Sequence, residues 1–290
     1  MTHLVRLIDS IAANDGDGVK IQRIAGRHLN SVLDPFLMID EINSDNATDY
    51  IGGFPEHPHR GFETITYMKA GRMRHRDHMG NVGVIQPGDV QWMTAGKGVI
   101  HSEMPEQDSG LLHGFQIWLN LPAAEKMKPA AYRDIRSASI TEKKLADGGL
   151  IRVIAGNVKV ENTKLSGPLP PLTTQPILLD VQLSAHETVE LIFETENPIL
   201  VYSYDGQVHE RTERTERQNE GGAYKIKRRQ MGIFAKSRQL ILEAGESGAS
   251  FLLLGGRAIK EPIVQHGPFV MNNSMEIEQA IEDYQQQRFV

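Results

Sequence analysis

Two pairs of residues with metal-binding side chains lie in the first half of the chain: His57 with His59, and His101 with Glu103. The members of each pair are two residues apart, and side chains at this spacing on a β-strand point to the same face. Two barrel strands that each present such a pair inward supply four nitrogen and oxygen ligands. Burying four ionisable groups without a shared cation is unfavourable. The spacing therefore predicts one mononuclear metal site made of His57, His59, His101 and Glu103.

The absence of cysteine restricts the chemistry of this site. It removes thiolate ligands, disulfides and a cysteine nucleophile together, so a metal must be held by nitrogen and oxygen. Three neutral imidazoles and one carboxylate leave positions open on a metal that prefers five or six ligands, as Fe(II) does. Ligand type alone leaves Mn, Co, Ni, Cu and Zn open as well.

Short β-strands are the elements expected to position these residues. Apolar runs such as residues 61–68 and 114–121 alternate with Gly, Pro, Asn or Asp turns, and a second series of the same kind begins at Ile151. This pattern predicts an all-β fold with two domains, a metal-binding domain over residues 1–135 and a metal-free domain over residues 136–290.

Two further segments carry helical signals. The polar connector between the two series contains residues 140–147, which are expected to form one or two helical turns. Near the end of the chain, Asn273 and Glu276 form a capping-box pattern that predicts a short C-terminal helix packed back onto a barrel.

The remaining histidines and charged runs are interpreted as structural or solvated. His75 and His78 flank a Gly-Asn turn among charges and predict a solvated hairpin tip. Later histidines are isolated, and His266 is expected to be a structural residue in the loop after the last strand. Charged runs at residues 211–217 and 225–229 predict an exposed hairpin. The second domain is therefore expected to hold no metal, and to close the mouth of the first or bind partners.

Composition limits the classes of partner. A net charge of −6 and a pI near 6.0 oppose direct nucleic-acid binding, which needs a clustered basic surface. No apolar run approaches the ~18 residues of a membrane span. Asp9 and Asp15 stand where a signal sequence is apolar or small. We therefore expect a cytoplasmic protein without membrane contact.

The motifs around the candidate ligands resemble those of the pirin family, within the cupin superfamily. Residues 53–71 resemble the first cupin motif, and residues 87–101 resemble the second, which departs from the usual pattern by having Gly96 in place of a proline. Both halves of the chain carry segments similar to long pirin motifs, at residues 34–41, 57–67, 87–105, 114–122 and 261–272.

The resemblance implies a fold and a ligand set. It implies two tandem cupin barrels, of the double-stranded β-helix or jelly-roll type, with metal ligands at His57, His59, His101 and Glu103. Glu63 stands at the place of the usual cupin glutamate ligand, but pirins take this carboxylate from the second motif. Glu63 is therefore expected to orient a ligand histidine. The implied cofactor is one divalent metal ion per chain, Fe(II).

The resemblance also implies an activity. It points to a quercetin 2,3-dioxygenase-like enzyme that opens the central ring of a flavonol with O2 and releases carbon monoxide, with Glu103 as the catalytic base. An apolar wall of the substrate site, or plain core, is expected from Phe54, Met93, Phe115 and Trp118. The alternatives are an iron-dependent pirin-type regulatory protein that acts through protein partners, and a cupin isomerase that acts on sugars.

Overall fold

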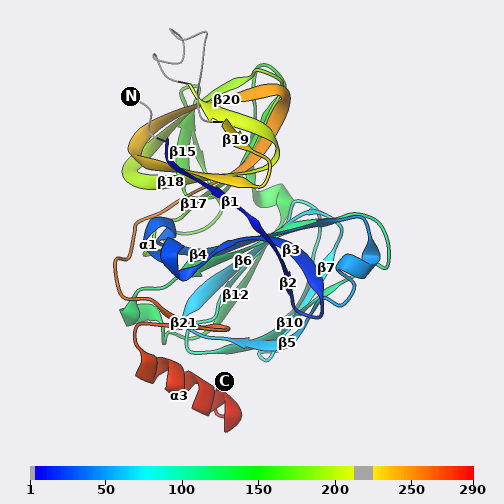
Figure 1. Cartoon of the computed structure of the whole chain (residues 1–290), viewed down its shortest axis with the longest axis vertical. Coiled ribbons are helices and arrows are strands. Elements are labelled where there is room, and N and C mark those ends of the chain that lie inside the picture. Colours follow the sequence, from blue (N-terminus) through cyan, green and yellow to red (C-terminus); the bar gives the residue numbers. More distant parts are fainter. Residues whose placement is uncertain (1–3, 212–224) are drawn as a thin grey trace. The chain divides into compact units, whose positions relative to one another are not determined.

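The computed structural model describes residues 4–211 and 225–290, so most of the charged run at 211–217 lies outside the described residues. The chain divides into two compact units. We call Ile11–Ser137 with Ile259–Val290 the first barrel, and residues 4–10 with Ala138–Ala258 the second barrel. Both are built from β-strands (Figure 1).

The first barrel consists of two antiparallel sheets and a terminal hairpin. The larger sheet contains, in spatial order, β12 (Ala131–Ile135), β9 (Val90–Thr94), β6 (Phe62–Ala70), β11 (Leu112–Asn120), β4 (Phe36–Ser44), β3 (Val19–Ala25) and β2 (Ile11–Asp15). The smaller sheet contains β5 (Phe54–His59), β10 (Val99–Pro105), β7 (Met73–Asp77) and β8 (Val82–Ile85). The hairpin pairs β21 (Val264–His266) with β22 (Phe269–Met271).

Short helical segments complete the first barrel. They are the 3-10 turns η1 (Arg27–Leu29), η2 (Ala47–Asp49), η3 (Ala123–Glu125) and η4 (Ser137–Ser139, continuing into the second barrel), and the helices α1 (Asn30–Leu33) and α3 (Ser274–Gln285). No described helix has the length and apolarity needed to cross a membrane.

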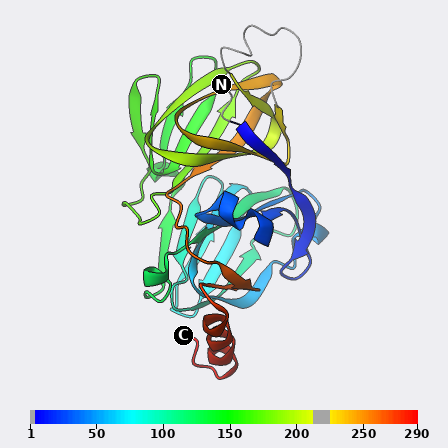
Figure 2. The ribbon, with the colours of Figure 1, turned by 60° about the vertical axis from the view of Figure 1, so that its left-hand side comes forward.

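The second barrel is a single sheet dominated by two long bent strands, β18 (Thr188–Glu210) and β20 (Gln230–Gly255). Residues Leu200 to Tyr202 of β18 pair with both ends of β20, because β20 curls around them and nearly closes the barrel. Figure 2 shows these strands wrapping around the interior. The other strands are β1 (Leu4–Asp9), β13 (Thr141–Lys144), β14 (Leu150–Ala155), β15 (Asn157–Val160), β16 (Thr163–Ser166), β17 (Ile177–Leu183) and β19 (Lys225–Lys227).

The two interiors differ in chemistry. One continuous cluster of buried aliphatic and aromatic residues fills the second barrel. In the first barrel the apolar core is divided into smaller clusters, and buried polar side chains lie among them, including His59, His101 and Glu103. Within the described residues, both groups of three or more convergent His, Asp or Glu ligand atoms belong to the first barrel.

The predicted all-β fold with a C-terminal helix is confirmed. The Asn273 side chain accepts a hydrogen bond from the Glu276 N–H at 3.0 Å and caps α3. The helical turns predicted within residues 140–147 are wrong, because Thr141–Lys144 forms β13 and pairs with β14. Cross-strand pairing there overrides the local helical preference.

The ends of the chain differ from the predicted domain ranges. Residues 4–10 contain β1, which pairs with β20, so they lie in the second barrel. Residues 259–290 lie in the first barrel, where the N–H of Val270 donates to the Arg60 carbonyl at 3.0 Å. Both contacts join segments far apart in sequence, so strand order alone gives no sign of them.

Lys126 ties the terminal hairpin to the body of the first barrel. This buried ammonium donates to the carbonyls of Gly61 at 2.8 Å and Val270 at 3.0 Å, and to Oδ1 of Asn120 at 2.6 Å. Burial lowers the pKa of Lys126 to about 8, while nearby glutamates act in the opposite direction. The group is therefore still charged at neutral pH, and all three of its N–H bonds have an acceptor.

Replacing Lys126 with methionine is expected to destabilise the first barrel by about 3 kcal/mol, since three buried oxygens lose their donor. Urea unfolding followed by tryptophan fluorescence reports on this barrel, because both tryptophans, Trp92 and Trp118, lie in it. Lys97 is exposed and serves as the control, where Lys97→Met should change stability by less than about 0.5 kcal/mol. Equal stability of the two variants would contradict the role of Lys126.

Candidate metal centre

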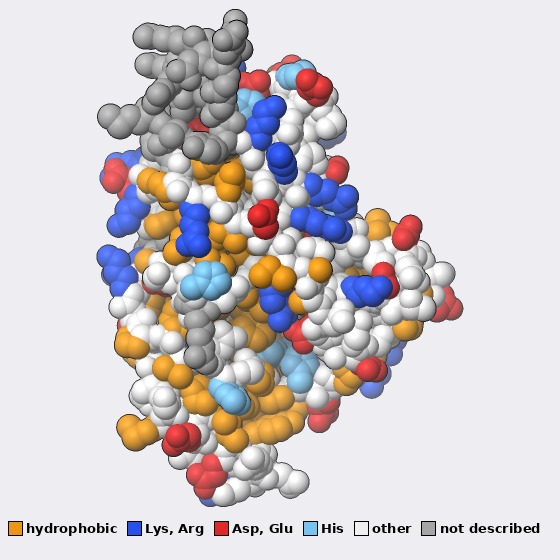
Figure 3. All heavy atoms as spheres, viewed as in Figure 1, with side chains coloured by type: hydrophobic (Ala, Val, Ile, Leu, Met, Phe, Trp, Pro, Cys, Tyr) orange, Lys and Arg blue, Asp and Glu red, His pale blue; other side chains and the backbone are white. Residues whose placement is uncertain are grey.

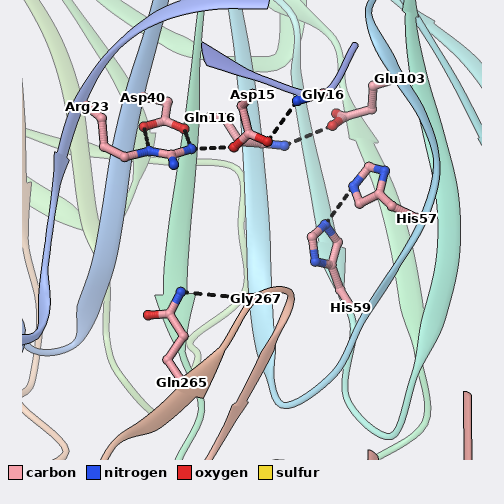
Figure 4. Close-up of polar contacts among 10 residues, drawn as sticks. All are labelled: Asp15, Gly16, Arg23, Asp40, His57, His59, Glu103, Gln116, Gln265 and Gly267. Carbon is pink, nitrogen blue, oxygen red and sulfur yellow. Dashed lines mark hydrogen bonds and ion pairs between the residues drawn. The ribbon is translucent and has the colours of Figure 1, made fainter. Parts of the chain in front are cut away.

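The pairing of β5 with β10 brings the predicted histidines together. His101 stands directly opposite His57 in this antiparallel ladder, and Val99 stands opposite His59. The Nε2 atoms of His57 and His59 are 3.0 Å apart, and their rings converge as Figure 4 shows. Ring centroids of His101 lie 4.4 Å from His57 and 4.9 Å from His59. The three imidazoles therefore surround one point, as the spacing in the sequence predicts.

Burial keeps two of these imidazoles neutral. Desolvation lowers the pKa of His59 well below its usual value, and the neighbouring His57 adds to this effect. The pKa of His101 is lowered mainly by desolvation. Electrostatic interactions with His59, His57 and His75 lower this pKa further. A neutral imidazole has a free lone pair on one ring nitrogen, which is the form that binds a metal.

The residues present fit a bound metal ion. The ligand nitrogens of His57, His59 and His101 lie within 4.8 Å of one another. Nε2 of His101 is buried and has no hydrogen-bond partner, which is unfavourable in a protein interior unless a ligand occupies it. Neutral imidazoles suit the divalent transition metals of the iron-to-zinc series.

Glu103 lies beside this centre and is held by two other side chains. Its Oε1 accepts from the Thr66 hydroxyl at 2.8 Å, and its Oε2 accepts from the Gln116 amide at 2.9 Å. Its carboxylate groups with His101 and His75 within 4.8 Å, rather than with the other two histidines. The alternation along β10 is regular, since His101, Ser102 and Glu103 pair in register with β7, and the register shift lies on the β5 side, between Phe54 and His57.

The prediction that His75 lies at a solvated hairpin tip is wrong. His75 is fully buried, and its Nδ1 lies 3.4 Å from Nδ1 of His101, whereas His78 is exposed as expected. Alternating burial along β7 carries His75 inward between two exposed arginines, Arg74 and Arg76. That period-two pattern was the available signal, and the adjacent turn obscured it.

Glu63 and His266 also differ from their predicted positions. Glu63 is buried, and its oxygens accept from Nε1 of Trp92 at 3.1 Å and from the Thr94 hydroxyl at 2.6 Å rather than from a histidine ring. His266 ends β21 and is exposed, so it is not in a loop after the last strand.

A cavity of about 750 Å³ opens beside the histidines in the first barrel. Phe54 and Trp118 line it, as predicted, together with His57 and His59. The ring of Trp118 lies 5.3 Å from that of His59. Figure 3 shows histidine and hydrophobic side chains together in a hollow of this surface. The cavity thus combines aromatic walls with the candidate ligands.

The other two predicted wall residues lie elsewhere. Met93 belongs to a buried cluster with Ala95 and Val99, and Phe115 lines a smaller neighbouring pocket.

An ion-pair group on β2, β3 and β4 forms another part of the cavity wall (Figure 4). Arg23 donates to both oxygens of Asp40, from Nε at 2.8 Å and from Nη2 at 2.6 Å, and it also contacts Asp15. Burial lowers the pKa of Arg23, but its bonds to Asp40 and Asp15 outweigh this and raise the pKa overall. This wall is therefore charged and pre-ordered.

Comparison with known proteins identifies the family. The Pirin family model matches residues 18–119, and the model of the Pirin C-terminal cupin domain matches residues 178–290. The chain is 46% identical over 271 residues to a Vibrio cholerae protein named "Putative quercetin 2,3-dioxygenase", covering 93% of this chain and 92% of that protein. Its identity to Homo sapiens Pirin is 35% over 273 residues, covering 93% and 88%.

A solved structure supports the same assignment. The crystal structure of quercetin 2,3-dioxygenase from Acinetobacter baumannii is similar with a TM-score of 0.87 and 30% sequence identity, covering 100% of this chain and 98% of that one. With both family models matched and relatives aligned over nearly their whole length, this chain belongs to the pirin family, with two cupin domains.

Proposed function

We propose that this protein is a metal-dependent dioxygenase that opens the ring of a flavonol with O2, like quercetin 2,3-dioxygenase. The main support is one observation: convergent imidazoles, two of them buried and neutral, adjoin a cavity of about 750 Å³ with aromatic walls. The names of the Vibrio cholerae and Acinetobacter baumannii relatives agree with this activity.

The proposed cofactor is one Fe(II) held by His57, His59, His101 and Glu103. The geometry of the histidines supports three of these ligands, and Glu103 adjoins them through His101. When bound, the metal supplies Lewis acidity that favours the ionised form of a substrate hydroxyl and brings substrate and O2 together. The choice of iron follows from the family resemblance.

The protein side chains bind the flat substrate and receive its proton. Phe54 and Trp118 offer apolar surface for the ring system. In this proposal Glu103 accepts the proton of the flavonol hydroxyl, and the support is that Glu103 lines the cavity and that Thr66 and Gln116 hold its carboxylate by hydrogen bonds. The carboxylate of Glu103 thus has two proposed roles, as a metal ligand and as the catalytic base.

We expect about one metal per chain, and occupancy should depend more on Glu103 than on Glu63. Glu103→Ala removes a proposed ligand oxygen, whereas Glu63→Gln alters contacts to Trp92, Thr94 and Lys128. Elemental analysis of the reconstituted proteins measures both effects, with thermal unfolding to verify folding. Two tightly held metals per chain would contradict a single site. Full occupancy in Glu103→Ala with loss in Glu63→Gln would reverse the ligand assignment.

Fe(II)-loaded protein should consume O2 when quercetin is added, and Glu103→Gln should slow this turnover. An amide oxygen still coordinates a metal but does not accept a proton at neutral pH. Loss of a general base lowers rates by about 10²- to 10⁴-fold, and raising the pH until quercetin ionises in solution should restore part of the rate. An oxygen electrode measures uptake in metal-matched samples.

The exposed helix residue Glu278 provides the control, and Glu278→Gln should react at the wild-type rate. A wild-type rate in metal-loaded Glu103→Gln would show that the proton leaves by another route. If loaded wild-type protein takes up no O2 with quercetin, the dioxygenase proposal fails, and a metal-dependent protein that acts through protein partners takes its place.

A further inference from the structure

Three buried residues form a line that ends at the candidate metal centre. His75 on β7 stands opposite Glu103 on β10, with Nδ1 3.4 Å from Nδ1 of His101. On its other side, Nε2 of His75 makes no hydrogen bond and lies at ion-pair distance, 3.5 Å, from Oδ2 of Asp77, and neither side chain is exposed to solvent. The line therefore runs from Asp77 through His75 to His101.

Asp77 is an anchored end of this line. Its Oδ1 accepts from the backbone N–H groups of Met79 at 2.9 Å and Asn81 at 3.0 Å, and its Oδ2 accepts from the Asn81 side chain at 2.8 Å. An ionised carboxylate only accepts hydrogen bonds, so the group that faces it from His75 must be a donor.

The ring of His75 is also held in its plane. It packs against Tyr132, with ring centroids 4.8 Å apart and an angle of 31° between the planes. The Tyr132 hydroxyl donates to Asp134 at 2.6 Å and accepts from Gln91 at 3.1 Å. His75 therefore presents its two ring nitrogens to Asp77 and His101 in a fixed orientation.

This geometry determines where the protons lie. If the neutral imidazole of His75 carries its proton on Nε2, toward Asp77, then its Nδ1 is an acceptor, and Nδ1 of His101 must carry the proton between the two rings. Nε2 of His101 is then left with its lone pair; this atom, like Nε2 of His75, is buried without a hydrogen-bond partner, and the His101 ring lies beside His57 and His59. The opposite arrangement points a lone pair of His75 at the carboxylate of Asp77, which is repulsive.

We propose that His75 is a positioning residue, which together with Asp77 holds His101 in the tautomer whose Nε2 faces the metal. The inference rests on His101 being a metal ligand, as the proposed function requires. Partners of this kind that orient ligand histidines affect metal affinity by about 10- to 100-fold.

The direct test is the proton position, measured by long-range ¹H–¹⁵N correlation spectra of the histidine rings. In metal-free and in Zn(II)-loaded wild-type protein, we expect the proton on Nδ1 of His101 and on Nε2 of His75. Zn(II) is diamagnetic and does not require turnover, so this result is independent of flavonol oxidation. A proton on Nε2 of His101 in the metal-free protein would overturn the proposal.

Variants test the effect on affinity. His75→Phe and Asp77→Asn should weaken Zn(II) binding by about 10- to 100-fold in competition with a chelator. His75→Gln should recover part of this loss, because its amide oxygen accepts from Nδ1 of His101. His28 is exposed in the same barrel, and His28→Gln should bind Zn(II) like wild type.

The outcomes separate this proposal from the proposed function. Wild-type affinity in folded His75→Phe would overturn the positioning role even if oxygen uptake is intact. Weakened binding in His75→Phe with partial recovery in His75→Gln would support the role even if no flavonol is oxidised. Equal losses in His75→Phe and His75→Gln would indicate packing rather than proton placement and would also overturn it.

Discussion

The antiparallel pairing of β5 with β10 is the constraint on which the candidate site depends. It sets His101 opposite His57 and places His59 beside both rings, with His59 and His101 buried in the barrel and His57 partly exposed. Two consequences follow from that burial. The pKa values of His59 and His101 fall, which frees lone pairs, and the cost of burying these polar rings is offset when they share a cation.

The two barrels show how similar strand architectures can have different interiors. In the second barrel, apolar residues such as Val201, Phe251 and Leu253 form one continuous hydrophobic core. In the first, imidazoles and carboxylates interrupt the apolar clusters, and a cavity opens beside them. Both halves are β-barrels, so the difference in chemistry lies in their side chains, and among the described residues the candidate ligand groups belong to the first barrel.

Local periodicity accounts for what the sequence predicts well. The two-residue spacing of His57 with His59 and the cap at Asn273 depend only on neighbouring residues, and both match the structure. The inward direction of His75 follows from the local alternation of β7, but its contact with His101 depends on the pairing of β7 with β10, which is not local. Likewise β13 forms because β14 offers it a partner. Features that depend on which strands pair, whether neighbours such as β13 and β14 or more separated strands such as β7 and β10, were therefore the ones missed.

The C-terminal segment has a closer relation to the site than its place in the sequence indicates. Arg60, which directly follows His59, donates to Asp283 at 2.7 Å and to the Phe289 carbonyl at 3.3 Å, and its guanidinium lies 4.3 Å from the centre of the Phe289 ring. The turn of the terminal hairpin, at Gly267 and Pro268, lines the cavity. The end of the chain is thus bonded to the residue next to a candidate ligand, and it supplies part of the cavity wall. An intact C-terminal segment is therefore part of the architecture of this site, in addition to its role as packing for the barrel.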